Sequence, residues 1–403
     1  MTDLKTTTVE SAQTSLWERL AELALLFLKL GTISFGGPAA HVALIESEIV
    51  HKRKWVTRQQ FLDMLGAANL IPGPTSTEMA INTGFIRAGW AGMCIAGASF
   101  IIPAAIVTGG FAWAYVRFGS LPQTASVLGG IKPAVIAVIA IAIWRLGKTA
   151  MKDAGLAVLG VAALVAFFLA VNPILILLGG GLIGMAARRM STMRGTTTLL
   201  IPSMFCKTLF FRGPVLGAIA IVTGVLATRP PLMRVALFFL KVGAVLYGGG
   251  YVLLAFLEHG LVQQNGWLTQ KQLLDAVAIG QFTPGPVLST ATFIGYLLGG
   301  IPGAAVATVG IFLPSFFYVA LLAPVLFRLR KSAWMGAFLD SVNVCAVALM
   351  AGVTFRLAAD ALRGWISWAI GAVALSVLLR WKVGPAWVVL GGGVVGLLLA
   401  VVR

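Results

Sequence analysis

Long apolar runs alternate with short polar segments along this chain, and the length of the runs indicates the fold class. Residues 154–187 and 276–327 contain no charged side chain. About 20 apolar residues are enough to span a bilayer as a helix, so runs of this length predict several crossings. A transmembrane β-barrel would show short alternating segments instead. The pattern therefore predicts an all-α polytopic membrane protein.

The sequence also contains an internal repeat. The segment FLKLGTISFGG at 27–37 returns 212 positions later as FLKVGAVLYGG at 239–249. The same offset pairs the Pro-Gly-Pro at 72–74 with the Pro-Gly-Pro at 284–286, and an offset of 211 then pairs Pro103 with Pro314. A repeat of this extent predicts two homologous halves.

The repeat sets the expected domain organisation. Residues 20–195 are predicted to form the N-terminal transporter repeat and residues 229–403 the C-terminal one. Residues 1–19 are polar and are expected to form a tail. Residues 196–228 are expected to be a linker or an extra membrane segment.

The charges of the loops indicate that the two halves are inverted. HKRKWVTR in the first half is rich in positive charge, whereas its partner EHGLVQQNGWLTQ contains no Lys or Arg. Later in each half the bias is reversed, because RFGSLPQT has one Arg and RLRKSAW has three cations. Positive loops face the cytoplasm. The sequence therefore predicts inverted-topology repeats, which are typical of many secondary transporters.

Each Pro-Gly-Pro follows a helix-start signal. Thr57 with Gln60, and Thr269 with Gln272, have the spacing of a capping box. A helix over 58–71 would be about 21 Å long, which is shorter than the roughly 30 Å hydrocarbon core. The helix should therefore end inside the membrane, as part of a broken or re-entrant hairpin. The residues expected to break it are Pro72, Pro74, Pro284 and Pro286.

A new helix that starts inside the membrane offers a place for an anion. Its first N–H groups have no acceptor within the helix, and its dipole is positive at that end. If the halves are inverted, one hairpin enters from each side and the two tips meet near the midplane. We therefore predict an anion cradle made of two helix starts. The alternative is a pair of kinks that serve packing alone.

The predicted substrate-binding residues are cations, glycines and neutral hydrogen-bond donors on or near these segments. The other interpretations are snorkelling for the lysines, close helix packing for the glycines and helix capping for the polar residues. The residues are Lys29, Gly36, Gly37, Asn69, Gly73, Thr75, Ser76, Thr77, Lys241, Gly248, Gly249, Gln281, Gly285, Ser289 and Thr290.

Acidic and basic residues near the cradle have separate interpretations. Glu78 is a proton-coupling candidate, or else the partner of Thr75 in a capping box; the second half has Thr290 at this position. The acids of the entering helices are expected near the surface, with structural or gating roles, and two further cations are expected to line the path. These four residues are Asp63, Asp275, Arg87 and Lys132.

Composition narrows the function classes. The chain is 59% hydrophobic and 11% charged, with a net charge of +17. Because Lys and Arg gather in short clusters between apolar runs, the charge indicates cytoplasmic loops and no nucleic acid is expected. Cys94, Cys206 and Cys345 lie far apart, so neither disulfides nor a metal site is predicted. No cofactor and no enzymatic activity are expected, and a homodimer is only a base-rate expectation.

The motifs FGGPAAH, IPGPTSTEMAINTG, LYGGG and DAVAIGQFTPGPV resemble the chromate ion transporter family over about residues 20–150 and 233–355. The resemblance implies a bacterial inner-membrane exporter of chromate, driven by the proton motive force and giving resistance. Many members have Gln where this chain has Glu78, so a sulfate or other oxyanion transporter, an exchanger and an anion channel remain alternatives. The family motif falls on Phe35, Gly36, Gly37, Pro38, His41, Trp55, Pro72, Gly73, Pro74, Gly248, Gly249, Gly250, Pro284, Gly285 and Pro286.

Overall fold

The computed structural model shows only helices and turns in the part of the chain that it describes, which confirms the all-α fold. Four of the described helices are long and apolar enough to cross a membrane: Thr75–Phe118, Thr124–Ala150, Val287–Leu321 and Trp334–Ala361. The described residues are 15–35, 38–69, 71–119, 121–193, 230–247, 250, 252–322, 333–381 and 383–402.

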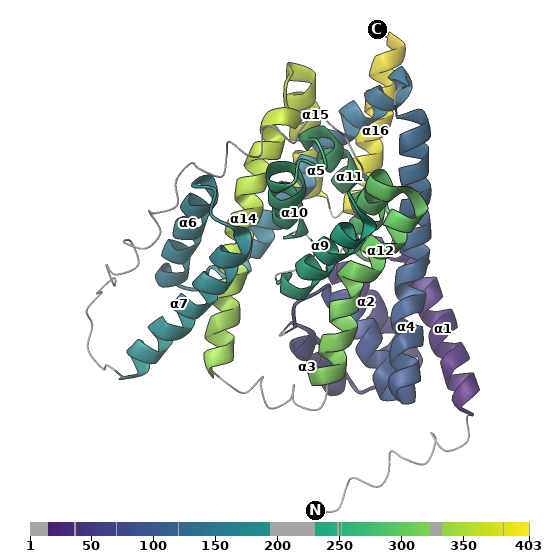
Figure 1. The fold of residues 1–403 in the computed structure, drawn as a ribbon, viewed down its shortest axis with the longest axis vertical. Helices are drawn as coiled ribbons and strands as arrows, with labels where there is room; N and C mark the ends of the chain where they lie inside the picture. The colour runs from purple at the N-terminus through teal and green to yellow at the C-terminus, as the bar shows by residue number, and fades with distance from the viewer. Residues whose placement is uncertain are drawn as a thin grey trace, which may run out of the picture.

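The helices follow the same order in the two halves (Figure 1). The first half contains α1 (Leu16–Ile33), α2 (Pro38–Glu46), the π-helix η1 (Ser47–Lys52), α3 (Arg58–Ala68), α4 (Thr75–Phe118), α5 (Pro122–Ala150), α6 (Ala154–Phe168) and α7 (Pro173–Met193). The second half contains α9 (Leu232–Val245), α10 (Leu253–Leu257), the π-helix η3 (Glu258–Gln264), α11 (Gln270–Phe282), the 3-10 helix η4 (Val287–Ser289), α12 (Thr290–Leu322), α14 (Ala333–Ala361), α15 (Trp365–Arg380) and α16 (Pro385–Val402).

The helix boundaries differ from the predicted ones at two places. α1 begins at Leu16, inside the expected tail, because Ser15 and Glu18 form a capping box. α3 ends at Ala68, before the predicted end at residue 71, and Asn69 is its C-cap. The predicted linker at 196–228 lies outside the described residues.

α4 and α12 are each two helices joined by a sharp turn. The backbone leaves helical geometry at Ala88-Gly89 and at Gly299-Gly300, where Gly89 has φ +61° and Gly300 has φ +64°. Gly84, before the turn, packs directly on the backbone of Gly92, which lies the same number of residues after Ala88 as Gly84 lies before it. The chain therefore reverses, so the first segment of α4 runs antiparallel to the second.

This reversal makes α3 and the first segment of α4 a hairpin with Pro-Gly-Pro at its tip. At the end away from the tip, Arg87 forms an ion pair with Glu22 of α1 at 3.1 Å. Its guanidinium also lies 5.0 Å from the ring centroid of Trp55, just before α3. The two ends of the hairpin are thus side by side.

The long outer helices are exchanged between the halves. α5 packs against α15 and α16, while α14 packs against α6 and α7, as the groups at the top and left of Figure 1 show. Small residues allow the close approach, as is usual between membrane helices: Gly130 contacts the backbone of Gly396, and Gly184 contacts Ser341. These two contacts are equivalent by the repeat, so the exchange follows the internal symmetry.

Candidate anion site at the two hairpin tips

Each hairpin tip is tied to the opposite half by a backbone hydrogen bond. The Gly73 N–H donates to the Leu246 carbonyl at 2.8 Å, and the Gly285 N–H donates to the Ser34 carbonyl at 2.9 Å. Gly73 has φ +145° and Gly285 has φ +82°, a region that L side chains rarely adopt. We call these two contacts the first crossing (Gly73 with Leu246) and the second crossing (Gly285 with Ser34).

The two crossings are related by the repeat, because Gly73 corresponds to Gly285 and Ser34 to Leu246. Ser34 and Leu246 directly follow α1 and α9 and are not helical. New helices begin after both tips, at Thr75 and at Val287. Helix starts carry N–H groups without an intrahelical acceptor and a partial positive charge. The sequence-based prediction of two helix starts at the two breakers agrees with this geometry.

Buried polar atoms without a hydrogen-bond partner gather on the segments that form the crossings. Such atoms are rare in proteins, because burying a polar group without a partner is unfavourable. Most of those found among the described residues are here, and they can bind a polar ligand or water. They are Ser34 Oγ, both ring nitrogens of His41, Thr77 Oγ1, both carboxyl oxygens of Glu78, Gln281 Nε2 and Ser315 Oγ.

The first crossing contains a carboxyl group. Glu78 is fully buried, and its Oε1 lies against the Cα of Gly73 together with the hydroxyl of Ser315 from α12. The interpretation of Thr75 and Glu78 as a capping box is wrong, because the start of α4 has no side-chain cap hydrogen bond. The N-cap of α4 is Pro74, so Glu78 is the fourth helical residue rather than the third. The Thr75 hydroxyl instead approaches Asn69 Oδ1 at 3.4 Å.

The polar side chains directly after the second tip, Ser289 and Thr290, are neutral. The Thr108 hydroxyl donates to Ser289 Oγ at 3.1 Å. The hydroxyl of Thr290, which stands where the first half has Glu78, donates to the Val287 carbonyl at 2.8 Å. Ala104, in place of Ser315, lies against Gly285. The two crossings are therefore alike in backbone and different in chemistry.

The predicted cationic ligands lie away from the crossings. Lys29 and Lys241 are both exposed. Lys29 Nζ lies 3.3 Å from Glu48 Oε1, which also binds Lys52 Nζ at 2.9 Å, and Glu48 Oε2 binds the guanidinium of Arg53. Burial alone would raise the pKa of Glu48, but hydrogen bonds from Lys52, Lys29 and Arg53 outweigh it and lower the pKa from 4.5 to about 2. Lys29 thus belongs to a cluster around an ionised acid.

The remaining charged candidates also have partners. Arg87 does not line a path to the tips, because it pairs with Glu22 at the far end of the hairpin. The prediction that Asp275 lies near the surface is wrong: it is 0% exposed, since α5 covers it. Asp275 Oδ1 forms an ion pair with Lys132 Nζ at 2.8 Å, and Asp275 Oδ2 accepts a hydrogen bond from the Tyr115 hydroxyl at 2.8 Å. Asp63, its counterpart, is partly exposed and accepts from Gln59 at 3.3 Å.

Other predicted site residues vary in their placement. Gly36, Gly37, Gly248 and Gly249 lie outside the described residues. Ser76, Thr77, Ser289 and Thr290 are buried beside the tips, whereas Asn69 is exposed. Sequence reasoning missed Ser34, Ser315 and Thr108. They stand opposite Leu246, Ala104 and Val319 in the other half, so the repeat gave no signal for them.

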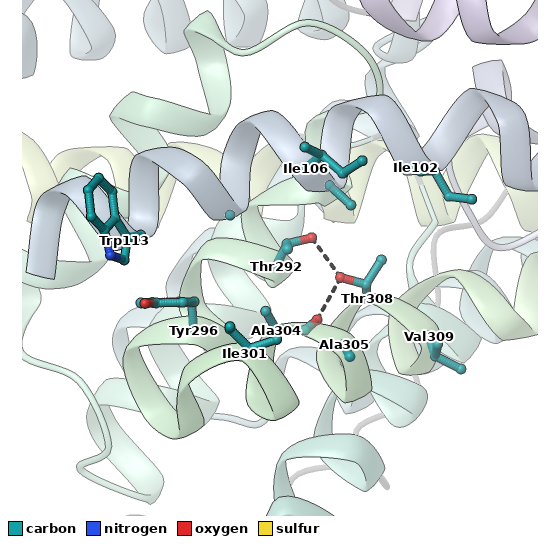
Figure 2. A pocket seen from close by; sticks show the side chains of 12 residues that line it. Ile102, Ile106, Trp113, Thr292, Tyr296, Ile301, Ala304, Ala305, Thr308 and Val309 are labelled. Atoms are coloured by element: carbon teal, nitrogen blue, oxygen red, sulfur yellow. Dashed lines mark hydrogen bonds between the residues drawn. The ribbon is translucent and has the colours of Figure 1, made fainter.

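A cavity of about 480 Å³ lies between α4 and α12, and neither Gly73 nor Gly285 lines it (Figure 2). Its two threonine hydroxyls are hydrogen-bonded within the protein. Thr308 Oγ1 lies 2.7 Å from Thr292 Oγ1, and the Thr308 hydroxyl donates to the Ala304 carbonyl at 2.7 Å. Apart from the hydroxyl of Tyr296, the rest of its lining is mainly apolar and includes the exposed side chains of Ile106 and Trp113. This cavity suits hydrocarbon and has no feature that would hold an anion.

The fold and the two crossings define a multi-pass helical membrane protein built from two repeats. The family model described as chromate transporter matches residues 21–185 and 233–397, one match for each repeat. The chain belongs to the chromate transporter family, which confirms the resemblance inferred from the motifs.

Individual relatives match nearly the whole chain. A chromate transport protein of Cupriavidus metallidurans is 31% identical over 403 residues, 97% of this chain and 96% of the relative. A probable chromate transport protein of Synechococcus elongatus is 31% identical over 374 residues, 91% of each chain. An uncharacterized transporter of Methanocaldococcus jannaschii is 27% identical over 360 residues, 88% of each chain. No solved structure matches the chain.

Proposed function

We propose that this protein is a secondary transporter that exports chromate across the plasma membrane, driven by the proton motive force, and thereby gives resistance to chromate. The observation that carries the proposal is the pair of crossings, where two symmetric helix starts meet buried polar groups that have no partner. The names of the two relatives at 31% identity support chromate as the substrate.

The bound oxyanion is held by neutral donors and helix dipoles. The donors in our proposal are the backbone N–H groups of Thr75 and Ser76, the hydroxyl of Thr77 and the amide of Gln281. Ser289 supplies a hydroxyl at the second helix start. Neutral donors suit transport, because a site must also release its ion.

The electrical part of the proton motive force favours export of a dianion. Moving one charge across 100 mV is worth about 2.3 kcal/mol, so two charges gain about 4.6 kcal/mol when the cell interior is negative. Glu78, whose carboxylate binds no cation or hydrogen-bond donor among the residues that the structure describes, carries one proton together with the anion in our proposal. One net negative charge then still moves outward, so the membrane potential drives export, while the proton itself moves against the pH gradient.

Sulfate transport is the second candidate function. Chromate and sulfate are both tetrahedral dianions, and the hydroxyl and amide donors at the tips suit either. Many members of the family have Gln at the position of Glu78. Because this residue departs from the family pattern, the substrate of this chain has to be tested separately from that of its relatives.

The test is exchange of labelled chromate in proteoliposomes that contain the purified protein. We expect external chromate to accelerate the release of internal labelled chromate, and a large excess of sulfate to slow this release little. Release that responds to sulfate and ignores chromate would establish the second candidate. Release that needs no external anion at all and saturates with neither would indicate a channel and contradict the proposal.

A further inference from the structure

Ser315 on α12 has a buried hydroxyl that the proposed mechanism does not use. The residue is 0% exposed, and its Oγ has no hydrogen-bond partner. A hydroxyl inside a helix commonly donates to the carbonyl four residues earlier, as Thr83, Thr308 and Thr354 do here. Ser315 does not, although burying a hydroxyl without a partner is unfavourable. We therefore expect a nearby group to bind this hydroxyl in some state of the protein.

The group that Ser315 faces is the carboxyl of Glu78. Ser315 Oγ and Glu78 Oε1 both crowd the position that a Cβ on Gly73 would take, and Ser315 Oγ lies 2.6 Å from that position. The serine comes from the second half and the glutamate from the first, and the side chain that Gly73 lacks would separate them. An ionised carboxylate only accepts hydrogen bonds, and a hydroxyl has one hydrogen to donate. The two unpartnered groups are therefore complementary.

The second crossing lacks both members of this pair. By the repeat, Ala104 stands in place of Ser315, and Thr290 stands in place of Glu78. Ala104 packs against the second tip as Ser315 packs against the first, so a methyl group is enough to fill this place. The hydroxyl of Ser315 is thus not needed for packing, and it occurs at the crossing that contains the acid.

No ionisable side chain forms an ion pair or a hydrogen bond with Glu78 among the described residues, so Ser315 is the donor that lies against its carboxyl. On the neighbouring helices, Lys29 and Lys241 are exposed, and Asp63 and Asp275 have the partners given above. The remaining titratable groups have other contacts: His41 packs edge-on against Phe100, the Tyr318 hydroxyl donates to the Ala244 carbonyl at 2.9 Å, and Tyr247 packs against Phe338.

We propose that Ser315 is a positioning residue for Glu78, and that its hydroxyl donates a hydrogen bond to the carboxylate when Glu78 is ionised. This bond stabilises the ionised form in the protein without substrate, and it thereby sets the pH at which Glu78 takes up its proton. The proton comes from water and is released with the chromate. No further proton moves, so each exported chromate still carries one net negative charge. The inference rests on the proposed function, because it takes Glu78 as the group that carries the proton.

The test is the pH profile of labelled chromate exchange in proteoliposomes with equal pH on both sides. Exchange should fall as the pH rises, because chromate moves together with a proton on Glu78. Without the hydroxyl of Ser315 the ionised carboxylate is less stable, so Glu78 keeps its proton to a higher pH. Ser315→Ala should raise the pH of half-maximal exchange by about one to two units, as expected for loss of a hydrogen bond to a charged group. The control Ser99→Ala, at a serine of α4 that is 8% exposed, should leave this pH unchanged.

Variants of Glu78 show whether Ser315 acts through this carboxyl. Chromate itself takes up a proton in weakly acidic solution, and Glu78→Gln should retain only that part of the pH dependence. The double variant Glu78→Gln/Ser315→Ala should have the same profile as Glu78→Gln. If Ser315→Ala does not fold, Ser315→Cys replaces it. A thiol is a weaker donor than a hydroxyl, so Ser315→Cys should shift the profile in the same direction.

The outcomes separate this inference from the proposed function. An equal pH of half-maximal exchange in the Ser315 variant and the wild-type protein would overturn the inference. A shift that persists in the Glu78→Gln background would also overturn it, because the serine would then act through another group. Wild-type exchange with no pH dependence beyond that of chromate would overturn it and leave chromate transport standing. Absence of chromate exchange in the wild-type protein would overturn the proposed function itself.

Discussion

At the residue scale, the first crossing depends on the absence of a side chain at Gly73. A Cβ there would collide with Glu78 Oε1 and lie 2.6 Å from Ser315 Oγ, and the backbone has φ +145°. We expect Gly73→Ala to abolish chromate exchange in proteoliposomes. The alanine must either move the carboxyl and the serine or open the hydrogen bond to Leu246.

The matched control is Gly129→Ala on α5. A Cβ at Gly129 meets no atom within 4 Å, and this glycine has no positive φ. Alanine also favours a helix over glycine by about 1 kcal/mol, so exchange should remain as in the wild-type protein. Full activity in Gly73→Ala would show that the first crossing is not part of the substrate site.

Glu78 allows a second prediction at this scale. Glu78→Gln keeps the shape of the side chain and removes its proton exchange. We expect chromate exchange to persist while the movement of protons that accompanies net chromate transport falls by one for each chromate. A pH-sensitive dye inside the proteoliposomes measures this. The account of Glu78 fails if the ratio of protons to chromate is the same in the variant and the wild-type protein.

At the element scale, the buried ion pair between Lys132 and Asp275 joins α5 of the first half to α11 of the second. Removing one partner of such a pair costs about 3–5 kcal/mol, because the other charge stays buried. We expect Lys132→Met to lower thermal stability in detergent strongly, and the double variant Lys132→Met/Asp275→Leu to recover most of the loss. Unfolding is followed by thermal denaturation at fixed detergent concentration.

The control for this prediction is an exposed pair with similar geometry. Lys152 Nζ lies 2.7 Å from Asp340 Oδ1, and the two side chains are 58% and 30% exposed. Exposed pairs contribute about 0–1 kcal/mol, so Lys152→Met should have little effect. Equal effects of Lys132→Met and Lys152→Met would mean that Asp275 is accessible to water and does not hold α11 in place.

Local signals predicted some elements well and others poorly. The capping boxes at Thr57 and Thr269 are confirmed, because a cap depends on residues three positions apart. The reversal at Ala88-Gly89 was not predicted. Glycine is common in membrane helices, so it gives no sign of a turn. The burial of Asp275 was not predicted either, because α5, which covers it, is more than a hundred residues away in sequence.

At the scale of the whole molecule, the repeat was visible in the sequence and the exchange of outer helices was not. Matching motifs at a fixed offset reveal two halves directly. The contact of Gly130 with Gly396 joins different halves, and nothing in either local segment indicates its partner. The same limit applies to the crossings, where the breakers were predicted but their acceptors, Leu246 and Ser34, were not.

The inverted orientation of the halves gives a prediction for the whole molecule. His51 and Gln264 are exposed and lie just before the two hairpins, one position from equivalence in the repeat, because Gln263 is the counterpart of His51. In a variant whose native cysteines are replaced by serine, we expect His51→Cys to react with a membrane-impermeant maleimide only from the cytoplasmic side. Gln264→Cys should react only from the outside. Reaction of both positions from one side would mean that the halves are parallel.

The central claim is that the two crossings form the site of an exporter driven by the proton motive force. The most direct test is chromate uptake into inverted membrane vesicles, with and without an imposed gradient of electrical potential that makes the lumen positive, and with Gly73→Ala in parallel. The account predicts accumulation that needs the gradient, withstands excess sulfate and is lost in Gly73→Ala. Accumulation that is equal without the gradient, or that persists in Gly73→Ala, would contradict it.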